Sequence, residues 1–155
     1  MSSHDASAAA LSAIFKAYDI RGIYGDEIDE AIVRRIGNAF ARFAGAERIL
    51  VGRDMRPSSE PLSEAFAEGV IMAGADVTML GLCSTDLVYF ASGHLDAPAA
   101  MFTASHNPAQ YNGVKFCLAG ARPVGADTGL ADIKALAQSV LDGHGPVAAA
   151  RAGNR

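Results

Sequence analysis

The sequence predicts an α/β protein, a three-layer α/β/α arrangement in which helices flank a mixed, mainly parallel sheet of about four strands. Short apolar runs, each of a length suited to a buried strand, alternate with longer segments whose apolar residues recur at helical spacing. Such alternation indicates parallel strands joined by right-handed crossovers. Because half of the 155 residues are hydrophobic, the chain can bury one core, and we expect a single domain.

The composition excludes several classes of protein. The 13 basic residues against 17 acidic ones give a net charge of -4, and no run of lysine and arginine offers a surface for nucleic acid. Charged residues and glycine interrupt every apolar stretch before the roughly 20 residues needed to cross a membrane. Cys83 and Cys117 have neither metal-ligand nor disulfide spacing, and the first residues lack the segments of a signal peptide. We therefore expect free thiols and a cytoplasmic protein.

The chain is expected to become ordered near Ile14. Residues 1–13 are rich in serine and alanine and are predicted to be a flexible leader, mobile or partly helical. Residues 15–20 are compatible with a strand. Gly22 and Gly25 supply the freedom for a hairpin-like reversal after it.

The first helix is predicted to begin after Asp29, whose side chain can cap it, and to end at Gly45. Residues 49–51 then form a short buried strand. One face of the helix carries its apolar residues, which are Ile32, Ile36, Phe40 and Phe43.

A second strand–helix unit continues from the turn over residues 52–58. Ser58 is predicted to cap its helix, and Gly74 to end it. Residues 76–80 return as another strand. The buried stripe of this helix contains Leu62, Phe66 and Val70.

Two further strands are predicted in the last third of the chain. Thr85 can cap a short helix that leads to an apolar run over 99–102, which is predicted to be a buried strand. Over residues 114–118 the side chains alternate, with Lys115 and Cys117 on the face opposite the larger apolar residues.

The last helix is predicted to begin at Asp127 or Thr128. The domain therefore spans residues 14–142, and residues 143–155 are predicted to be a linker stub leading toward a second domain that this sequence does not contain. The aligned apolar residues of the helix are Leu130, Ile133, Leu136 and Val140.

A polar segment directly after the strand over 99–102 carries the candidate chemistry. It reads Thr-Ala-Ser-His-Asn-Pro over residues 103–108 and lies at the carboxyl end of a strand, where open α/β sheets bind ligands. Pro108 keeps the residue before it out of the helical region, so Ser105 is expected on a loop. The same residue types are common in ordinary loops, and a loop without chemistry is the alternative.

Ser105 and His106 are unsuited to act as nucleophile and base, because successive residues in an extended segment point to opposite sides. The G-x-S-x-G motif of serine hydrolases is also missing, which argues against acyl transfer. A phosphorylated Ser105 fits the residues better, since a phosphoserine needs cationic neighbours, and often a metal, instead of an adjacent base.

Two motifs resemble the α-D-phosphohexomutase family. Thr103-Ala-Ser-His-Asn-Pro108, followed by Tyr111-Asn-Gly-Val-Lys115, is similar to the active-serine loop of that family. Upstream, Phe15-Lys-Ala-Tyr-Asp-Ile-Arg-Gly22 resembles the opening motif of its phosphomannomutase/phosphoglucomutase branch. The resemblance covers most of the chain and the first of the family's four domains, the one with the catalytic serine. A departure is Thr85-Asp86, where relatives usually carry Thr-Pro, and this alters a helix start.

The resemblance implies roles for residues around Ser105, which would be the phosphoryl carrier. It places Arg21 near the phosphoserine, with a solvated turn arginine as the alternative. Lys115 would stabilise charge or donate a proton, or else be an edge-strand lysine that discourages aggregation. Tyr18 would lie at the edge of the substrate cleft or be a half-buried strand tyrosine. His106 would donate a hydrogen bond to the phosphate or titrate near neutral pH, or pack within the loop.

The loop after the strand over 49–51 resembles a family loop near the cleft, but we interpret its residues as structural. Asp54 is expected to pair with a neighbouring arginine, Arg53 or Arg56. Ser58 is expected to cap the helix, with Glu60 near the helix's positive end. The histidines at 4, 94 and 144 show no ligand spacing.

By resemblance, the chain is the first domain of a phosphohexomutase that moves a phosphoryl group between O1 and O6 of mannose or glucose phosphate. The phosphoryl group would pass through Ser105 and a hexose 1,6-bisphosphate, and Mg²⁺ would bridge an oxygen of the phosphoserine to three aspartates. We find no Asp-Gly-Asp metal loop, sugar-selecting loop or phosphate-clamping loop, so this chain alone is expected to be inactive without the remaining domains. The alternative is a phosphosugar-binding or assembly module without turnover.

Overall fold

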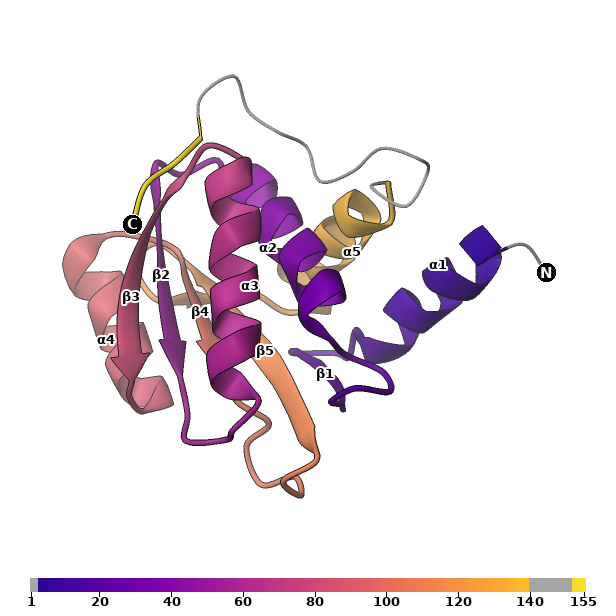
Figure 1. Cartoon of the computed structure of the whole chain (residues 1–155). Coiled ribbons are helices and arrows are strands. Elements are labelled where there is room, and N and C mark those ends of the chain that lie inside the picture. Colours follow the sequence, from indigo (N-terminus) through magenta and orange to yellow (C-terminus); the bar gives the residue numbers. More distant parts are fainter. Residues whose placement is uncertain (1–2, 140–151) are drawn as a thin grey trace.

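The computed structural model describes residues 3–139 and 152–155, and a sheet with helices on both faces confirms the predicted α/β class (Figure 1). The helices are α1 (Ser3–Ile14), α2 (Glu30–Ala44), α3 (Ser59–Met72), α4 (Thr85–Leu95) and α5 (Leu130–Ser139), with a short 3-10 helix η1 (Ala126–Thr128) before the last. The strands are β1 (Ile20–Ile23), β2 (Arg48–Arg53), β3 (Asp76–Leu82), β4 (Ala99–Phe102), β5 (Tyr111–Leu118) and β6 (Arg122–Pro123).

The sheet is mixed, as predicted. Its strand order is β1-β5-β4-β2-β3, and β6 pairs with β5 outside this path. β2 is parallel to β3 and to β4, whereas β5 is antiparallel to β4, β1 and β6. The sheet has six strands instead of about four. The apolar residues of β1 are separated by an arginine and a glycine, and β6 has only two residues, so neither shows an apolar run in the sequence.

The two faces of the sheet pack against different sets of helices. A large core joins side chains of α1, α2, α3 and α5 to one face, where Val114 and Phe116 of β5 lie. A smaller core joins α4 to the other face, where Met101 of β4 and Cys117 of β5 lie. Alternate residues of β5 therefore enter different cores, which confirms the two unlike faces predicted for this strand.

Phenylalanines fill the centre of the larger core. The rings of Phe40 on α2 and Phe116 on β5 stack with centroids 4.4 Å apart, and Phe66 on α3 meets Phe102 on β4 edge to face at 5.4 Å. All four side chains are fully buried. The contacts fix α2 and α3 against the strands on either side of the Ser105 loop.

The beginning of the chain differs from the sequence prediction. Residues 1–13, expected to be a mobile or partly helical leader, form helix α1 from Ser3 onward, and Leu11 and Ile14 are buried in the larger core. The predicted strand over 15–20 is wrong, because only Phe15 and Ile20 form an antiparallel bridge. The chain reverses between these two residues, and β1 starts only at the end of this reversal. It turns again after β1 at Gly25, whose φ of 92° agrees with the turn predicted there. β1 then pairs with β5, a partner far along the sequence.

Helix boundaries confirm two predicted caps, correct two helix starts and show that one predicted capping bond is not formed. Asp29 caps α2 through a bond from the Ile32 N–H at 2.8 Å, and Gly45 ends it in the left-handed conformation. Ser84 caps α4 in place of Thr85, and Ser58 makes no capping bond at α3. The last helix, α5, begins at Leu130 after a break at Gly129 instead of at Asp127 or Thr128. Val140 and most of the predicted linker over 143–155 lie outside the described residues.

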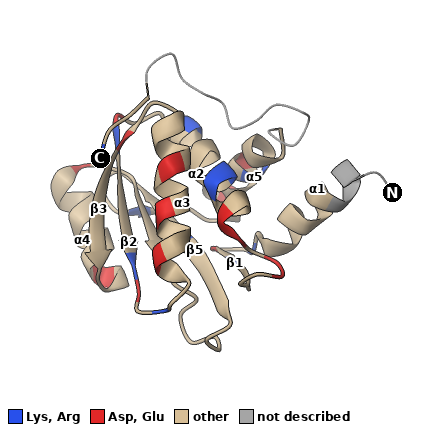
Figure 2. Ribbon diagram, viewed as in Figure 1, with Lys and Arg blue, Asp and Glu red and all other residues tan. Residues whose placement is uncertain are grey.

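Acidic residues line α3 along its length, as Figure 2 shows, and the glutamates of this helix pair with arginines from three other parts of the chain. Glu60 pairs with Arg53 of β2, Glu68 with Arg34 of α2, and Glu64 with Arg155 near the end of the chain. The last four residues also meet β3, where the Val77 N–H donates to the Asn154 carbonyl at 2.7 Å. These contacts tie separate segments to one exposed helix face.

Candidate active site

Ser105 lies on the loop between β4 and β5, as predicted, and its side chain is exposed. The Thr103 N–H donates to the Gly113 carbonyl at 3.1 Å, so the loop leaves the sheet only after Thr103. Ser105 itself has a positive φ of 53°, in the left-handed region that non-glycine residues rarely adopt. Its N–H donates to the Thr103 hydroxyl at 3.1 Å. The loop therefore presents a solvent-accessible hydroxyl from an unusual backbone conformation.

Arg56, on the loop after β2, holds the Ser105 loop through hydrogen bonds from its side chain to the loop's backbone carbonyls. Nη2 donates to the carbonyls of Ser105 at 3.1 Å and Asn107 at 2.8 Å. Nη1 donates to those of Pro108 at 2.8 Å and Tyr111 at 3.0 Å. Arg56 is structural, as the sequence predicts, but its partners cannot be found from the sequence because they lie 49 to 55 residues further along the chain.

Asp54 orients Arg56, which confirms the predicted pairing of Asp54 with a neighbouring arginine. Oδ2 accepts from Arg56 Nε at 3.2 Å, and Oδ1 accepts from the Arg56 N–H at 3.0 Å and from the Ser59 hydroxyl at 2.6 Å. Both side chains are largely buried, with 14% of Asp54 and 12% of Arg56 exposed. The Asp54 N–H donates to the Phe102 carbonyl at 2.9 Å, so the loop after β2 adjoins the end of β4.

Asn112 joins the other end of the Ser105 loop to α3. It is fully buried, and its side-chain amide donates to the hydroxyls of Ser58 at 2.7 Å and Ser59 at 2.9 Å. Its Oδ1 accepts from the Gly113 N–H at 2.8 Å. Ser58 therefore bonds to β5 instead of capping α3, because β5 runs beside the start of that helix.

Arg21 and Lys115 share one face of the sheet with Ser105. Arg21 lies opposite Gly113 across β1 and β5, and residues 113 and 115 of one strand point to the same face. Lys115 lies opposite Met101 of β4. Met101 and Ser105 line a common pocket on that face. Arg21 and Lys115 therefore lie on one face of the sheet, but in the part of the chain that the structure describes no hydrogen bond joins Ser105 to either cation, and their roles toward Ser105 stay predictions.

The two cations differ in how firmly they are held. Arg21 Nη2 donates to the Asp19 carboxylate at 2.7 Å, and this carboxylate is buried. Arg21 Nε is buried without a hydrogen-bond partner among residues 3–139 and 152–155. Lys115 is half-buried, and no described carboxylate forms an ion pair with it. Both side chains therefore retain donors for an incoming anion.

Tyr18 and His106 are both exposed. The Tyr18 side chain is 83% exposed and lies before β1, which rules out the alternative of a half-buried strand tyrosine. It lines a pocket of about 350 Å³ together with residues around Gly125. His106 follows Ser105 on the outside of the loop, so the alternative of a packed loop histidine is also wrong. Neither residue's predicted role toward a substrate is tested by these positions.

The pocket beside Ser105 has a volume of about 330 Å³ and opens between the ends of β2, β3 and β4. Thr103, Met101 and Cys83 contribute to its wall. Cys83 is a free thiol, as predicted, and burial raises its pKa above the ordinary value of 9.0. At neutral pH the pocket wall therefore holds a neutral thiol.

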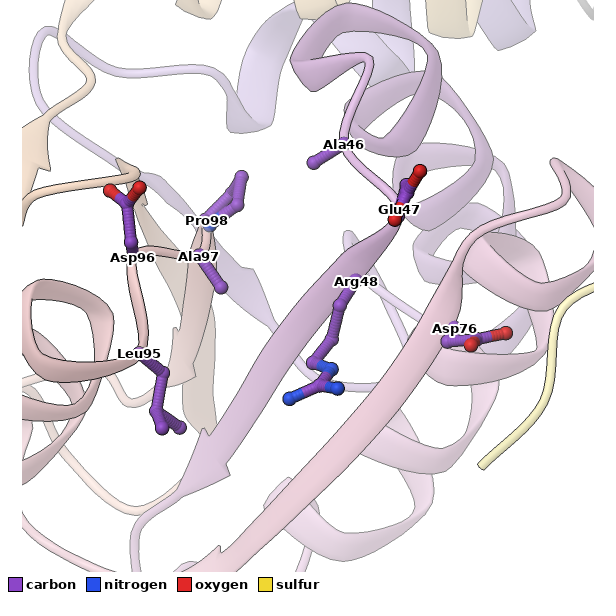
Figure 3. A pocket seen from close by; sticks show the side chains of 8 residues that line it. All are labelled: Ala46, Glu47, Arg48, Asp76, Leu95, Asp96, Ala97 and Pro98. Atoms are coloured by element: carbon purple, nitrogen blue, oxygen red, sulfur yellow. The ribbon is translucent and has the colours of Figure 1, made fainter.

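A second pocket, of about 400 Å³, lies at the opposite end of the strands (Figure 3). Figure 3 shows Arg48 at the start of β2, and Glu47, Asp76 and Asp96 are the acidic residues that line the same pocket. Three carboxylates against one guanidinium make this pocket unfavourable for a phosphate. It also lies at the amino ends of the parallel strands, whereas open α/β sheets bind ligands at the carboxyl ends. The pocket beside Ser105 is the better candidate site.

The described residues do not supply a metal site by themselves. They contain no group of three or more histidine, cysteine, aspartate or glutamate side chains that could hold a metal ion. A magnesium shell would need ligands from elsewhere. Among the same residues, no helix has the length and apolar character needed to span a membrane.

The chain is similar in sequence to known proteins. A sequence model described as phosphoglucomutase/phosphomannomutase, alpha/beta/alpha domain I, matches residues 12–141. A phosphomannomutase of Klebsiella pneumoniae is 48% identical over 125 residues, covering 80% of this chain and 80% of the relative. A phosphomannomutase of Escherichia coli (strain K12) is 47% identical over 126 residues, covering 81% of this chain but only 28% of the relative.

A solved structure shares the fold over nearly the whole chain. The crystal structure of a phosphoglucomutase/phosphomannomutase family protein from Burkholderia thailandensis matches with a TM-score of 0.76 and 34% sequence identity. The match covers 92% of this chain and 32% of that protein. The chain therefore spans about a third or less of the Burkholderia and Escherichia proteins that it resembles.

Proposed function

The chain belongs to the phosphoglucomutase/phosphomannomutase family, and on that premise we propose that it is the catalytic-serine domain of a phosphohexomutase. Its substrate would be a hexose phosphate, of mannose or of glucose. The observation that carries the proposal is the position of Ser105, an exposed hydroxyl on the loop that follows the carboxyl end of β4. Arg21 on β1 and Lys115 on β5 are the cations proposed to act on it.

The proposed reaction moves a phosphoryl group between O1 and O6 of the sugar. Phosphorylated Ser105 gives its phosphoryl group to the free hydroxyl of a hexose phosphate, and the hydroxyl proton is released as the new P–O bond forms. The hexose 1,6-bisphosphate then returns its other phosphoryl group to the Ser105 oxygen. Arg21 and Lys115 favour both steps by offsetting the negative charge on the transferring group.

The remaining site residues have supporting roles in the proposal. Lys115 donates a proton to the leaving oxygen or stabilises its charge. His106 donates a hydrogen bond to the phosphate from the outside of the loop, and Tyr18 contacts the sugar at the edge of the cleft. Magnesium would neutralise charge during transfer. One phosphoserine oxygen would contribute to its shell, and the other ligands would come from a further domain of the full-length enzyme, since the described residues do not provide them.

The greater length of the relatives and the free thiols of this chain support two further parts of the proposal. The chain spans only 28% of the Escherichia coli phosphomannomutase, so turnover would require the remaining domains. This chain alone would be inactive as a mutase, although its Ser105 would still take up one phosphoryl group. The free thiols of Cys83 and Cys117 favour a cytoplasmic location.

Intact-protein mass spectrometry tests the role of Ser105. After exposure to glucose 1,6-bisphosphate, a fraction of the wild-type chain should gain about 80 Da, the mass of one phosphoryl group. The Ser105→Ala variant should gain none, and Ser84→Ala, with its hydroxyl elsewhere on the same pocket wall, should label as the wild type does. A wild-type chain that never gains this mass would contradict the proposal.

A phosphosugar-binding or assembly module without turnover is the second candidate. It is favoured by the small share of the longer relatives that the chain covers. Adding the remaining domains as a separate polypeptide distinguishes the two candidates. Restored conversion of mannose 1-phosphate to mannose 6-phosphate supports the mutase domain, whereas binding without conversion supports the module.

A further inference from the structure

We propose that Arg56 is a positioning residue for phosphoryl transfer at Ser105. Its guanidinium holds the Ser105 loop in the backbone conformation that presents the hydroxyl, and it makes no contact with the phosphoryl donor. The inference rests on the proposed function of Ser105. It assigns to the loop after β2 a part in the reaction that the sequence motifs alone do not indicate.

The first argument is the number of donors on Arg56. A guanidinium has five N–H groups, and the structure gives Arg56 five bonds. Nε binds Asp54, each terminal nitrogen binds two loop carbonyls, and no donor remains for a phosphate. A lysine at this position would have only three donors on a single nitrogen, without the flat spread that reaches four carbonyls.

The second argument is the conformation of Ser105. Its φ of 53° is unfavourable for a residue with a side chain, and such a conformation persists only where the surroundings hold it. The peptide groups on both sides of Ser105 are held here. Its N–H donates to the Thr103 hydroxyl, and its carbonyl accepts from Arg56 Nη2, both at 3.1 Å. Removing the arginine releases the carbonyl side and lets the residue relax toward a common conformation.

The third argument is that Arg56 is itself fixed before any ligand arrives. Only 12% of its side chain is exposed, and the Asp54 carboxylate binds both its Nε and its backbone N–H. Asp54 is held in turn by Ser59 at the start of α3. The loop is thus shaped around a guanidinium that a rigid helix start keeps in place, as expected of a preorganised site.

Arg56 and Arg21 differ in whether their guanidinium donors are free to bind an anion. Arg21 donates one hydrogen bond to a described residue, from Nη2 to Asp19, and 34% of its side chain is exposed, so it can bind an anion directly. Arg56 is surrounded by carbonyl oxygens on one side and a carboxylate on the other. Losing Arg56 should therefore slow the transfer step without weakening the binding of the phosphoryl donor.

The test compares Arg56→Lys with Arg53→Lys in the 155-residue chain. Arg53 lies three residues earlier, and within residues 3–139 and 152–155 its one ion pair is with the exposed Glu60, at 3.7 Å, which makes it a matched control. The rate at which Ser105 gains a phosphoryl group from glucose 1,6-bisphosphate is measured by intact mass at several donor concentrations. For Arg56→Lys the rate at saturating donor should fall at least about tenfold, with the half-saturating concentration unchanged. Arg53→Lys should match the wild type in both.

A second measurement does not depend on phosphoryl transfer. The N–H groups of Asn107 and Tyr111 donate within the loop, to the carbonyls of Ala104 at 3.1 Å and Pro108 at 3.0 Å. Their hydrogen exchange should be slow in the wild type, although the loop is exposed, and at least about tenfold faster in Arg56→Lys. The Val114 amide within β5 should exchange equally slowly in both proteins.

The outcomes separate this inference from the proposed function. A wild type that gains no phosphoryl group overturns the role of Ser105, while the exchange data still decide whether Arg56 holds the loop. Equal labelling and equal exchange in Arg56→Lys and the wild type overturn the positioning role. A raised half-saturating donor concentration in Arg56→Lys, with an unchanged rate at saturating donor, also overturns the positioning role. If circular dichroism shows Arg56→Lys to be unfolded, Asp54→Asn replaces it. This variant should also lower the rate of Ser105 labelling and speed the hydrogen exchange of the loop amides, each by a smaller factor.

Discussion

Gly69 of α3 lies directly against the Arg34 carbonyl of α2, with no room for a side chain between the two helices. A Cβ at position 69 would overlap this oxygen and also the Asn38 nitrogen. Gly37 of α2 is packed in the same way against the Phe66 carbonyl. The two glycines let the helix backbones touch, which sets how closely α2 and α3 cover the sheet beneath the Ser105 loop.

Gly69→Ala is therefore expected to lower the free energy of unfolding by about 1–3 kcal/mol, because neither backbone can yield. Gly93→Ala is the matched control, since it is also a helix substitution, on α4, but has no atom within 4 Å of the new Cβ. Gly93→Ala should raise stability by about 0.5–1 kcal/mol through helix propensity alone. Urea unfolding followed by circular dichroism measures both. Equal effects of the two substitutions would contradict the close packing.

Asp29→Ala should lower the free energy of unfolding by about 1 kcal/mol, because the Ile32 N–H loses its partner at the start of α2. Asp26→Ala makes the same change of charge three residues earlier, at an exposed position, and should alter stability by less than about 0.5 kcal/mol. Thermal or urea unfolding of both variants checks the difference. A loss of equal size in both would point to net charge instead of the cap.

Asn112→Ala should lower the free energy of unfolding by about 2–3 kcal/mol, because it leaves the buried Gly113 N–H without its partner and opens a gap beside α3. Since Asn112 follows the Ser105 loop, hydrogen exchange of the Tyr111 amide should also become faster. Gln110→Ala, on the exposed part of the same loop, should change neither quantity measurably. An unchanged stability of Asn112→Ala would show that the buried bonds contribute little.

Stability should fall with rising pH in a way that depends on Cys117. Burial raises the pKa of this thiol above the ordinary value of 9.0, more than the Ser92 and Ala99 hydrogen bonds lower it. Above pH 9 the unfolded chain then loses the thiol proton while the folded chain keeps it, so the folded state is disfavoured as pH rises. The stability difference between the wild type and Cys117→Ala should shrink between pH 7.5 and 9.5, as measured by urea unfolding. A constant difference would contradict a raised pKa.

Arg21→Gln should affect labelling of Ser105 differently from Arg56→Lys. Because Arg21 retains donors that can bind a phosphate, its loss should raise the half-saturating concentration of glucose 1,6-bisphosphate by about tenfold. Arg122→Gln removes an exposed arginine on β6 and serves as the control, which should label as the wild type does. An unchanged half-saturating concentration in Arg21→Gln would argue against direct contact with the donor.

The sequence alone was sufficient where the deciding contacts are local. The Asp29 cap and the Gly45 end of α2 depend on hydrogen bonds that reach three or four residues, and the run over 99–102 is fully buried because all four residues are apolar or small. The position of Ser105 after that run, on a loop that Pro108 keeps from being helical, was predictable for the same reason.

Only the tertiary structure decided which distant groups meet. The strand order places the end of β2 beside the end of β4, and this brings Arg56 to carbonyls 49 to 55 residues away. The same order draws Ser58 from its expected cap to Asn112 of β5. It also aligns Arg21 of β1 with the face of β5 that carries Lys115. A side chain's partner across a sheet depends on which strands are neighbours, and local sequence patterns carry no information about that order.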